Sequence, residues 1–211
     1  MATLSGRALT QSALRPGFHL ARGMRVGLLG GSFNPAHAGH AHVAQTAMRR
    51  LRLDRVIWLV SPQNPLKDPR DSAPLSDRID SARRQARGAG MIVSDFESRL
   101  GLRYTVDTLS ALQTRYPGVH FVWLMGLDSL AAFHRWRFWT EVMRRVPVAV
   151  VARPGPIAAL LAPVTRRFAA HRVPGARAGG LALMTPPVWA YLNTRHNRLS
   201  STEIRRRHKS A

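Results

Sequence analysis

The sequence predicts an α/β protein in which a doubly wound parallel sheet of five or six strands carries helices on both faces. Short, continuous apolar runs are typical of strands buried on both sides of a parallel sheet, and the clearest are 55–60, 119–125 and 147–152. Segments with helical patterning separate these runs, which favours parallel strands joined by helical crossovers. Unusual loops follow three of the strands: 30–37, 61–68 and 126–129. Because ligands bind beyond the carboxyl ends of such strands, we expect these loops to converge on one cleft.

The segment 24–40 predicts a strand, a tight loop and the start of a helix. Val26–Leu29 is the apolar strand, and Gly30 and Gly31 after it let the backbone approach a ligand without a side-chain clash. A helix is expected over about 39–52. The unpaired amides and the positive dipole at such a helix start attract anions, so we expect a phosphate group to bind here.

Two histidines stand at this helix start. His37 and His40 are three residues apart, so they share one face of the first turn and can contact the same anion. A histidine pair alone is more often surface decoration. The prefix Gly-Gly-Ser-Phe-Asn-Pro over 30–35 favours the functional interpretation, and the spacing excludes both G-x-x-x-x-G-K-[ST] and G-x-G-x-x-G loops.

The other elements are assigned from apolar runs and helix punctuation. Further strands are expected at 55–60, 91–93, 119–125 and 147–152, and a strand at 181–185 would complete the upper count of six. Ser76 is a candidate N-cap for the second helix. Helices are expected at 76–87, 104–115, 140–145 and 157–172.

Composition limits the class of protein. The chain has 211 residues, enough for one well-buried domain, which we expect over 24–211. Residues 1–23 contain no Asp or Glu and are interpreted as a disordered extension or a start-site error, although an organellar transit peptide would have a similar composition. No apolar stretch approaches the roughly 18 residues needed to cross a bilayer. The absence of Cys is compatible with a soluble, cytoplasmic enzyme and leaves no thiolate metal site.

The net charge of +21 raises nucleic-acid binding as a rival function, because polyanions attract such a chain without sequence specificity. However, the 32 cationic residues are spread over the whole chain, and only Lys67 and Lys209 among them are lysines. Aromatic residues interleaved with the basic ones, which would stack on bases, are also lacking. We therefore expect no specific nucleic-acid partner.

Residues 199–207 offer a second helix start. Ser200-Ser-Thr-Glu203 fits the pattern S-x-x-E, so the simpler interpretation is a capping box. The hydroxyls of Ser201 and Thr202, with the guanidinium of Arg205 one turn later, could instead form a second anion site. Two helix starts that face one cleft could hold a triphosphate.

Taken together, the motifs resemble the nucleotidyltransferase superfamily, and within it the bacterial nicotinate-nucleotide adenylyltransferases, which have a Rossmann-like fold. G-x-F-[ND]-P-x-H-x-G-H over 31–40 is the superfamily signature, and the middle motifs are similar to the nicotinate-nucleotide branch. The matching segments are 62–67 (Pro-Gln-Asn-Pro-Leu-Lys), 104–109 (Tyr-Thr-Val-Asp-Thr-Leu), 126–130 (Gly-x-Asp-Ser-Leu), 133–136 (Phe-x-x-Trp), 151–155 (Val-Ala-Arg-Pro-Gly) and 199–205 (Leu-Ser-Ser-Thr-Glu-Ile-Arg).

This resemblance implies a reaction between ATP and nicotinate mononucleotide that yields nicotinate adenine dinucleotide and pyrophosphate. The attacking phosphate oxygen is already ionised at neutral pH, so no general base is required. Mg²⁺ would arrive with ATP, bound mostly by phosphate and water, and no protein-ligated metal is expected. Two alternatives stay open: a sister enzyme acting on nicotinamide mononucleotide or phosphopantetheine, and an Arg-rich nucleic-acid-binding protein. Whether the chain is a monomer or a homo-oligomer is not predicted.

The resemblance also implies roles for individual residues. The catalytic set would be His37, His40, Lys67 and Arg205. Further ATP contacts would come from Gly30, Gly31, Ser32, Phe33, Ser201 and Thr202. The nicotinate nucleotide would be bound by Asn64, Lys67, Thr105, Asp128, Trp136 and Arg137. On the residues alone, Trp136 could equally be part of the core and Asp128 a helix cap, and His42 is assigned no role.

Overall fold

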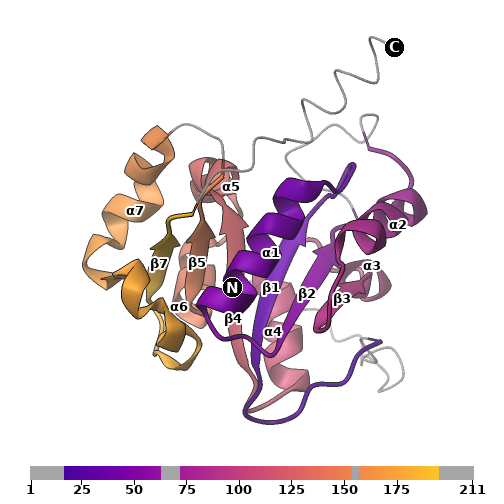
Figure 1. The fold of residues 1–211 in the computed structure, drawn as a ribbon, viewed down its shortest axis with the longest axis horizontal. Coiled ribbons are helices and arrows are strands. Elements are labelled where there is room, and N and C mark those ends of the chain that lie inside the picture. The colour runs from indigo at the N-terminus through magenta and orange to yellow at the C-terminus, as the bar shows by residue number, and fades with distance from the viewer. Residues whose placement is uncertain (1–16, 63–71, 154–156, 195–211) are drawn as a thin grey trace, which may run out of the picture.

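Seven parallel strands form one sheet, with the order β3-β2-β1-β4-β5-β7-β6 (Figure 1). The structure is a computed structural model and describes residues 17–62, 72–153 and 157–194. The chain builds outward from β1 through β2 to β3, then returns to the other side of β1 and continues through β4 and β5. The strands are β1 (Arg25–Gly31), β2 (Arg55–Val60), β3 (Met91–Ser94), β4 (His120–Gly126), β5 (Val148–Val151), β6 (Arg172–Val173) and β7 (Trp189–Leu192).

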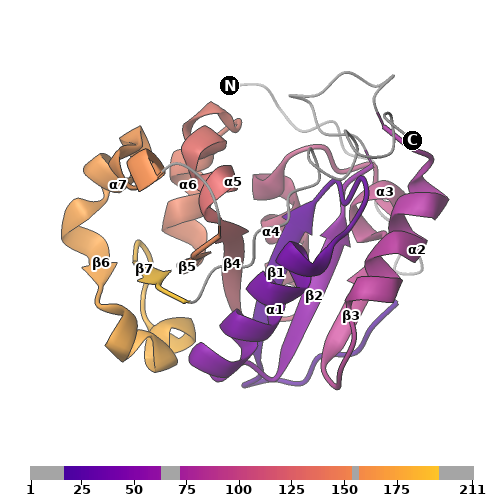
Figure 2. The same ribbon diagram turned by 45° about the horizontal axis from the view of Figure 1, so that its top comes forward.

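Helices cover both faces of the sheet, as predicted for a doubly wound fold (Figures 1 and 2). One face packs against α1 (Ala38–Arg50), α2 (Leu75–Gln85) and the 3-10 helix η5 (Gly175–Leu183). The other face packs against the remaining helices: α3 (Phe96–Arg99), α4 (Thr105–Arg115), α5 (Leu127–Ala132), η2 (Phe133–Arg135), α6 (Trp139–Arg145), η3 (Ile157–Leu161) and α7 (Pro163–Arg167). A further 3-10 turn, η4 (Ala169–His171), precedes β6.

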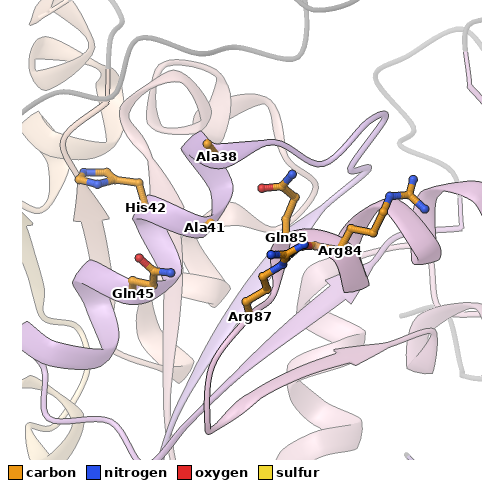
Figure 3. A pocket seen from close by; sticks show the side chains of 7 residues that line it. All are labelled: Ala38, Ala41, His42, Gln45, Arg84, Gln85 and Arg87. Carbon is orange, nitrogen blue, oxygen red and sulfur yellow. Dashed lines mark hydrogen bonds between the residues drawn. The ribbon is translucent and has the colours of Figure 1, made fainter.

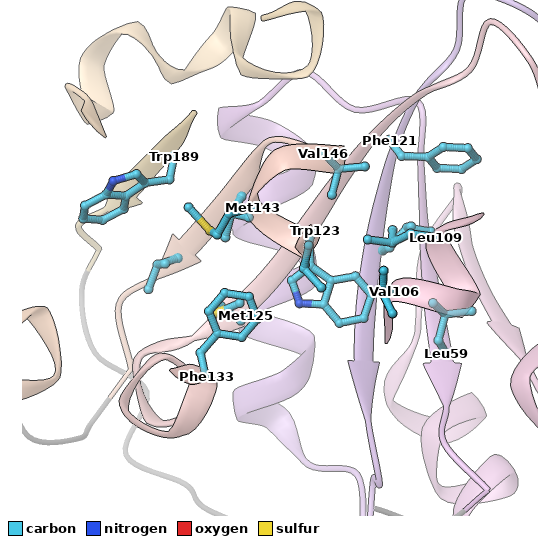
Figure 4. Close-up of a cluster of buried hydrophobic side chains, with 14 of the residues drawn as sticks. Leu59, Val106, Leu109, Phe121, Trp123, Met125, Phe133, Met143, Val146 and Trp189 are labelled. Carbon is cyan, nitrogen blue, oxygen red and sulfur yellow. The ribbon is translucent and has the colours of Figure 1, made fainter. Parts of the chain in front are cut away.

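Side chains alternate between the two faces along each strand, which explains the continuous apolar runs. In β2, Val56, Trp58 and Val60 belong to the core under α1, whereas Ile57 and Leu59 belong to the opposite core. Both sets are buried, so neither face can be polar. Figure 4 shows part of the opposite core around Trp123 of β4.

The count of five or six strands is wrong, because two strands beyond β5 complete a seven-stranded sheet. The first five strands lie where they are expected. The segment 181–185 is not a strand, because its apolar residues and Ala178 follow helical spacing: Ala178, Leu181 and Ala182 of η5 are all buried against the sheet. The last strand along the chain is instead β7, which pairs with β5 on one side and with the short edge strand β6 on the other (Figure 2).

Two details of the helices also differ from the expectation. The predicted helix over 157–172 is broken into η3, α7 and η4, and its last residue begins β6. Pro74 occupies the N-cap position of α2, and Ser76 makes no cap but donates its hydroxyl to Asp77 Oδ1 at 3.1 Å. No helix in the described ranges is long and apolar enough to cross a membrane.

Residues 17–23 contact the domain although they precede β1. Phe18 stacks on Tyr116 with ring centroids 5.9 Å apart, and the Tyr116 hydroxyl donates to Phe18 O at 2.6 Å. Leu20 is buried in the core, and Gly23 N–H donates to Gly118 O at 2.8 Å. The predicted extension stays a prediction for residues 1–16, which lie outside the described residues.

Candidate active site

The described part of the predicted site lies around the point where the strand order changes direction. β1 lies between β2 and β4, so the loops that follow β1 and β4 leave the sheet side by side. Such a switch point is where open α/β sheets bind ligands. The described members of the predicted set are Gly30, Gly31, Ser32, Phe33, His37, His40, Thr105, Asp128, Trp136 and Arg137. The other predicted site residues lie outside the described residues: Asn64, Lys67, Ser201, Thr202 and Arg205.

His37 and His40 cap the first turn of α1 reciprocally. Gly39 N–H donates to His37 Nδ1 at 3.1 Å, and His37 N–H donates to His40 Nδ1 at 3.2 Å. The ring centroids are 4.0 Å apart, so the expected side-by-side placement is confirmed. However, Gly39 N–H is occupied by the His37 ring, so this amide is not free for an anion, contrary to the sequence-based expectation. At least one of the amides at this helix start is therefore already paired with a side chain.

This capping arrangement also decides which ring nitrogen carries the proton. A backbone N–H can only donate, so Nδ1 of each ring must be unprotonated and the proton of each neutral ring lies on Nε2. His37 is only 3% exposed, and its Nε2 is buried without a hydrogen-bond partner among the described residues. An unpaired buried donor carries a free-energy penalty that a ligand can remove.

His37 is neutral at physiological pH. Burial lowers its pKa from 6.5 to about 4, because the imidazolium form loses hydration; the positive charge of Arg153 lowers it further, and the negative charge of Asp128 opposes both effects. The His37 ring therefore supplies no positive charge at this pH, and its Nε2–H is available only as a neutral hydrogen-bond donor.

The glycines of the loop after β1 are required by the packing around them. A Cβ added at Gly30 would lie 2.5 Å from Cη2 of Trp123, which is buried in β4. Phe33 is 1% exposed, and its ring packs against Trp58 and, edge-on, against His40, with centroids 5.2 and 5.0 Å apart. The Phe33 ring thus packs in the core against His40 and is not accessible to a ligand.

The residues predicted to bind the nicotinate group come together on the other side of the switch point. Trp136 is half-buried and packs edge-on against Phe133 and Trp123, at centroid distances of 5.1 and 6.0 Å. The Arg137 guanidinium lies 4.9 Å from the ring centroid of Tyr104 and donates to its hydroxyl at 3.3 Å. Thr105 is the first residue of α4, directly after Tyr104. These contacts join the start of α4 to the segment 136–137.

A buried carboxyl group supports the start of α4. The Thr108 hydroxyl donates to Glu97 Oε1 at 2.9 Å, and Glu97 is buried. Burial raises the pKa of Glu97 to about 7, while the bond from Thr108 acts in the opposite direction. The connection between Glu97 and the Tyr-Thr-Val-Asp-Thr motif was not predicted from the sequence.

Asp128 does not cap α5, because Gly126 is the N-cap residue and receives no side-chain bond. Asp128 Oδ1 instead lies 3.7 Å from Arg153 Nη1 in an ion pair. Arg153 follows β5 and is 6% exposed, and its Nε is buried without a hydrogen-bond partner among the described residues. The sequence motif Val-Ala-Arg-Pro-Gly contains Arg153 but predicted no role for it, although its place directly after a strand was the available signal.

A surface hollow of about 480 Å³ lies between α1 and the end of α2 (Figure 3). It contains none of the predicted site residues; its lining is Ala38, Ala41, His42, Gln45, Arg84, Gln85 and Arg87. His42 Nε2 is 2.9 Å from the Thr194 hydroxyl, so this ring is engaged away from the His37–His40 pair. The described part of the chain contains no group of three His, Asp or Glu side chains that could hold a metal ion.

Comparison with curated proteins identifies the family. A relative from Caulobacter sp. (strain K31) is 62% identical over 185 residues, which cover 87% of this chain and 98% of the relative. A relative from Cereibacter sphaeroides is 55% identical over 183 residues, covering 86% of this chain and 97% of the relative. Both are named as probable nicotinate-nucleotide adenylyltransferases. The chain belongs to the nicotinate-nucleotide adenylyltransferase family.

A family model and solved structures also match this chain. The cytidylyltransferase-like family matches residues 28–207. The structure of Plasmodium falciparum nicotinic acid mononucleotide adenylyltransferase complexed with NaAD is similar with a TM-score of 0.64 at 14% identity, over 87% of this chain and 83% of that chain. The same protein complexed with APC gives a TM-score of 0.62 at 14% identity. At this identity the likeness concerns the fold, and it confirms the Rossmann-like α/β architecture.

Proposed function

We propose that this protein transfers the adenylyl group of ATP to nicotinate mononucleotide and releases nicotinate adenine dinucleotide and pyrophosphate, a step of NAD biosynthesis. The observation that carries the proposal is the His37–His40 pair, in which a reciprocal cap sets two imidazoles 4.0 Å apart with their protons on Nε2. The relatives that share more than half of this sequence are named for the same reaction.

The reaction requires alignment of two anions more than it requires acid–base chemistry. A phosphate oxygen of nicotinate mononucleotide attacks the α-phosphorus of ATP, a new P–O bond forms, and the bond from the α-phosphorus to the α,β-bridging oxygen breaks. Pyrophosphate leaves with that electron pair. The attacking phosphate is already ionised, because its second pKa is about 6, so no side chain has to remove a proton. Catalysis therefore rests on orientation and on stabilising negative charge.

His37 and His40 donate their Nε2–H groups to the phosphates of ATP, with His40 nearest the α-phosphate. The buried, unpaired Nε2 of His37 gains a partner when the phosphate binds. Because the His37 ring is neutral at pH 7, it can donate its Nε2–H to a phosphate oxygen without first gaining a proton. Lys67, Ser201, Thr202 and Arg205 would add contacts to the phosphates, with Lys67 and Arg205 supplying positive charge.

The acceptor binds on the side of β4. We assign the nicotinate carboxylate to Thr105 and the amides near Arg137, the pyridine ring to Trp136, and a ribose hydroxyl to Asp128. The contact of Arg137 with Tyr104 holds the two carboxylate-binding segments together. Arg153 constrains the Asp128 carboxylate by the ion pair between them. Asn64, which follows β2 in the sequence, would also contact nicotinate mononucleotide.

Mg²⁺ is expected to enter with ATP, held by phosphate oxygens and water. Asp128 at this edge is engaged by Arg153, so the donor set near the switch point suits an ion that brings most of its own ligands. When bound, the ion neutralises charge on the phosphates. A cytoplasmic location, a single catalytic domain and the absence of a specific nucleic-acid partner remain predictions.

A pyrophosphate-release assay tests the proposal. ATP is supplied with nicotinate mononucleotide, nicotinamide mononucleotide or phosphopantetheine in parallel reactions. We expect rapid release with nicotinate mononucleotide and formation of nicotinate adenine dinucleotide. Faster turnover of either other acceptor would assign the protein to a sister activity, and no ATP-dependent release with any acceptor would contradict the proposal.

A further inference from the structure

One buried arginine connects the loop after β1 to the loop after β2. Arg78 of α2 is only 3% exposed, and its guanidinium donates four hydrogen bonds to described residues, all of them to backbone carbonyl oxygens. Nε donates to Ala73 O at 3.0 Å, and Nη2 donates to Pro62 O at 2.7 Å. Nη1 donates to both Ser32 O at 2.9 Å and Ser61 O at 2.7 Å. These bonds reach loops that lie 46 and 17 residues away in sequence.

A second residue on the same face of α2 contacts the other end of the loop after β1. Ser81 is one turn beyond Arg78 and is also buried. Its Oγ accepts from Ala36 N–H at 2.8 Å and lies 3.5 Å from Ala36 O. Arg78 and Ser81, here called the α2 clamp, therefore contact the loop at residues 32 and 36, immediately before His37.

The contacts of Arg78 are directional hydrogen bonds and not ion pairs. Within the described ranges, the donors of Arg78 go to carbonyl oxygens and not to carboxylates, so the buried charge is stabilised by hydrogen bonds alone. The bonds use Nε and both Nη atoms, in the planar fork that only a guanidinium has. A lysine ammonium could reach some of these oxygens but not all of them in the same geometry.

The orientation of one peptide unit follows directly. The Ser32–Phe33 peptide is not among the cis bonds, so its C=O and N–H point in opposite directions. Because Ser32 O is bonded to Arg78, the N–H of Phe33 must face away from α2. The guanidinium thus sets the direction of a backbone donor within the loop that bears Gly30, Gly31 and His37.

We propose that Arg78, assisted by Ser81, is a positioning residue that fixes the phosphate-binding loop after β1 relative to the start of the loop after β2. This inference rests on the proposed adenylyl transfer. Arg78 touches neither substrate. Its effect is exerted through the backbone of residues 32–36 and thereby through His37 and His40.

The experiment compares Arg78→Met and Arg78→Lys with Arg83→Met, a matched change on the same helix. The Arg83 side chain is 66% exposed and pairs only with Asp80 within the described residues. We expect Arg78→Met to lower kcat/KM by about 10²-fold, because displacing a substrate-aligning loop by about 1 Å has an effect of that order. KM for ATP should rise, Arg78→Lys should recover part of the loss, and Arg83→Met should match the wild type. Millimolar guanidinium should partly restore Arg78→Met.

Two structural measurements separate positioning from general stability. Thermal unfolding of each variant sets an assay temperature at which it is fully folded. Amide hydrogen exchange should then increase in peptides covering 30–37 in Arg78→Met and stay unchanged there in Arg83→Met. Normal kcat/KM in Arg78→Met, or full recovery of activity on cooling into the folded range, would overturn the proposal.

If Arg78→Met does not fold, Ser81→Ala decides, with exposed Ser76→Ala as its control. Ser81→Ala should raise KM for ATP several-fold and increase exchange at 30–37, whereas unchanged kinetics and exchange would overturn the clamp. An inactive wild-type protein with ATP and nicotinate mononucleotide would contradict the proposed function instead. In that case the hydrogen-exchange comparison still tests whether the clamp holds the loop.

Discussion

Replacing His37 by Asn should remove one defined part of the pH dependence of stability. Asn is among the most favourable N-cap residues, so its Oδ1 can accept from Gly39 N–H in place of the imidazole. The Asn side chain has no titratable group. The helix start should therefore remain, while any effect of burying a neutral imidazole disappears.

The sign and size of that effect follow from the lowered pKa. The unfolded chain has a His37 pKa near 6.5 and the folded protein one of about 4. Above pH 6.5 the ring is neutral in both states, so His37 adds no pH dependence. As the pH falls below 6.5, the unfolded chain binds a proton that the folded protein does not, and the free energy of unfolding decreases. The loss reaches roughly 2 kcal/mol at pH 5 and stops growing below the folded pKa.

The assay is chemical denaturation followed by circular dichroism at a series of pH values, for the wild type and for His37→Asn. The difference between the two curves is needed because Glu97 acts in the opposite direction: its pKa rises from 4.5 to about 7, so its effect on stability grows more unfavourable as pH rises through that range. Subtraction removes this contribution. His134→Asn, at an exposed position, is the matched control and should leave the wild-type curve unchanged.

The reasoning predicts that the wild type loses stability relative to His37→Asn as the pH falls from 6.5 toward 4. Parallel curves over this range would refute it, because they would mean that folding does not disfavour the imidazolium form. A divergence that appears equally in His134→Asn would also refute it, since the effect would then not be specific to the buried ring.

Three further predictions concern catalysis, acceptor choice and the N-terminus. His40→Ala should lower kcat by about 10²-fold, or roughly 3 kcal/mol, with the fold intact; near-normal kcat would make the pair structural. The nicotinate carboxylate can accept hydrogen bonds from two convergent donors, whereas the nicotinamide amide leaves one donor unsatisfied, at a cost of about 1–3 kcal/mol for each buried group. The value of kcat/KM should therefore favour nicotinate over nicotinamide mononucleotide by at least about 10²-fold. Thr105→Val should weaken the acid form selectively and Trp136→Ala both forms, and equal efficiency in the wild type would contradict this assignment. Deleting residues 2–16 should leave turnover and melting temperature unchanged. Deleting residues 2–23 should lower the free energy of unfolding by roughly 1.5–3 kcal/mol, because buried Leu20 is lost. Equal stability of the two truncated proteins would contradict this prediction.

Patterns within a few residues were enough to predict most of the sheet and the centre of the site. β1, β2, β4 and β5 are largely buried, so each leaves a continuous apolar run that can be recognised without knowledge of the fold. His37 and His40 were placed together because residues three apart at a helix start lie on the same face of the first turn. The loops after β1 and β4 were expected to converge, because parallel strands end at the same edge of a sheet.

Contacts between distant segments decided the rest. β7 pairs with β5, and β6 in turn pairs with β7, whereas residues 181–183 are also apolar but are helical where they pack on the sheet. Arg78 is one of several arginines on a polar helix, and its burial depends on backbone carbonyl groups from other segments, among them those of Ser32 and Ser61. Likewise, the protonation state of His37 depends on the packing that excludes water from its ring and on the charge of Arg153 beyond β5. Burial and electrostatic environment are sums over neighbours from many segments, so tertiary structure alone determined them.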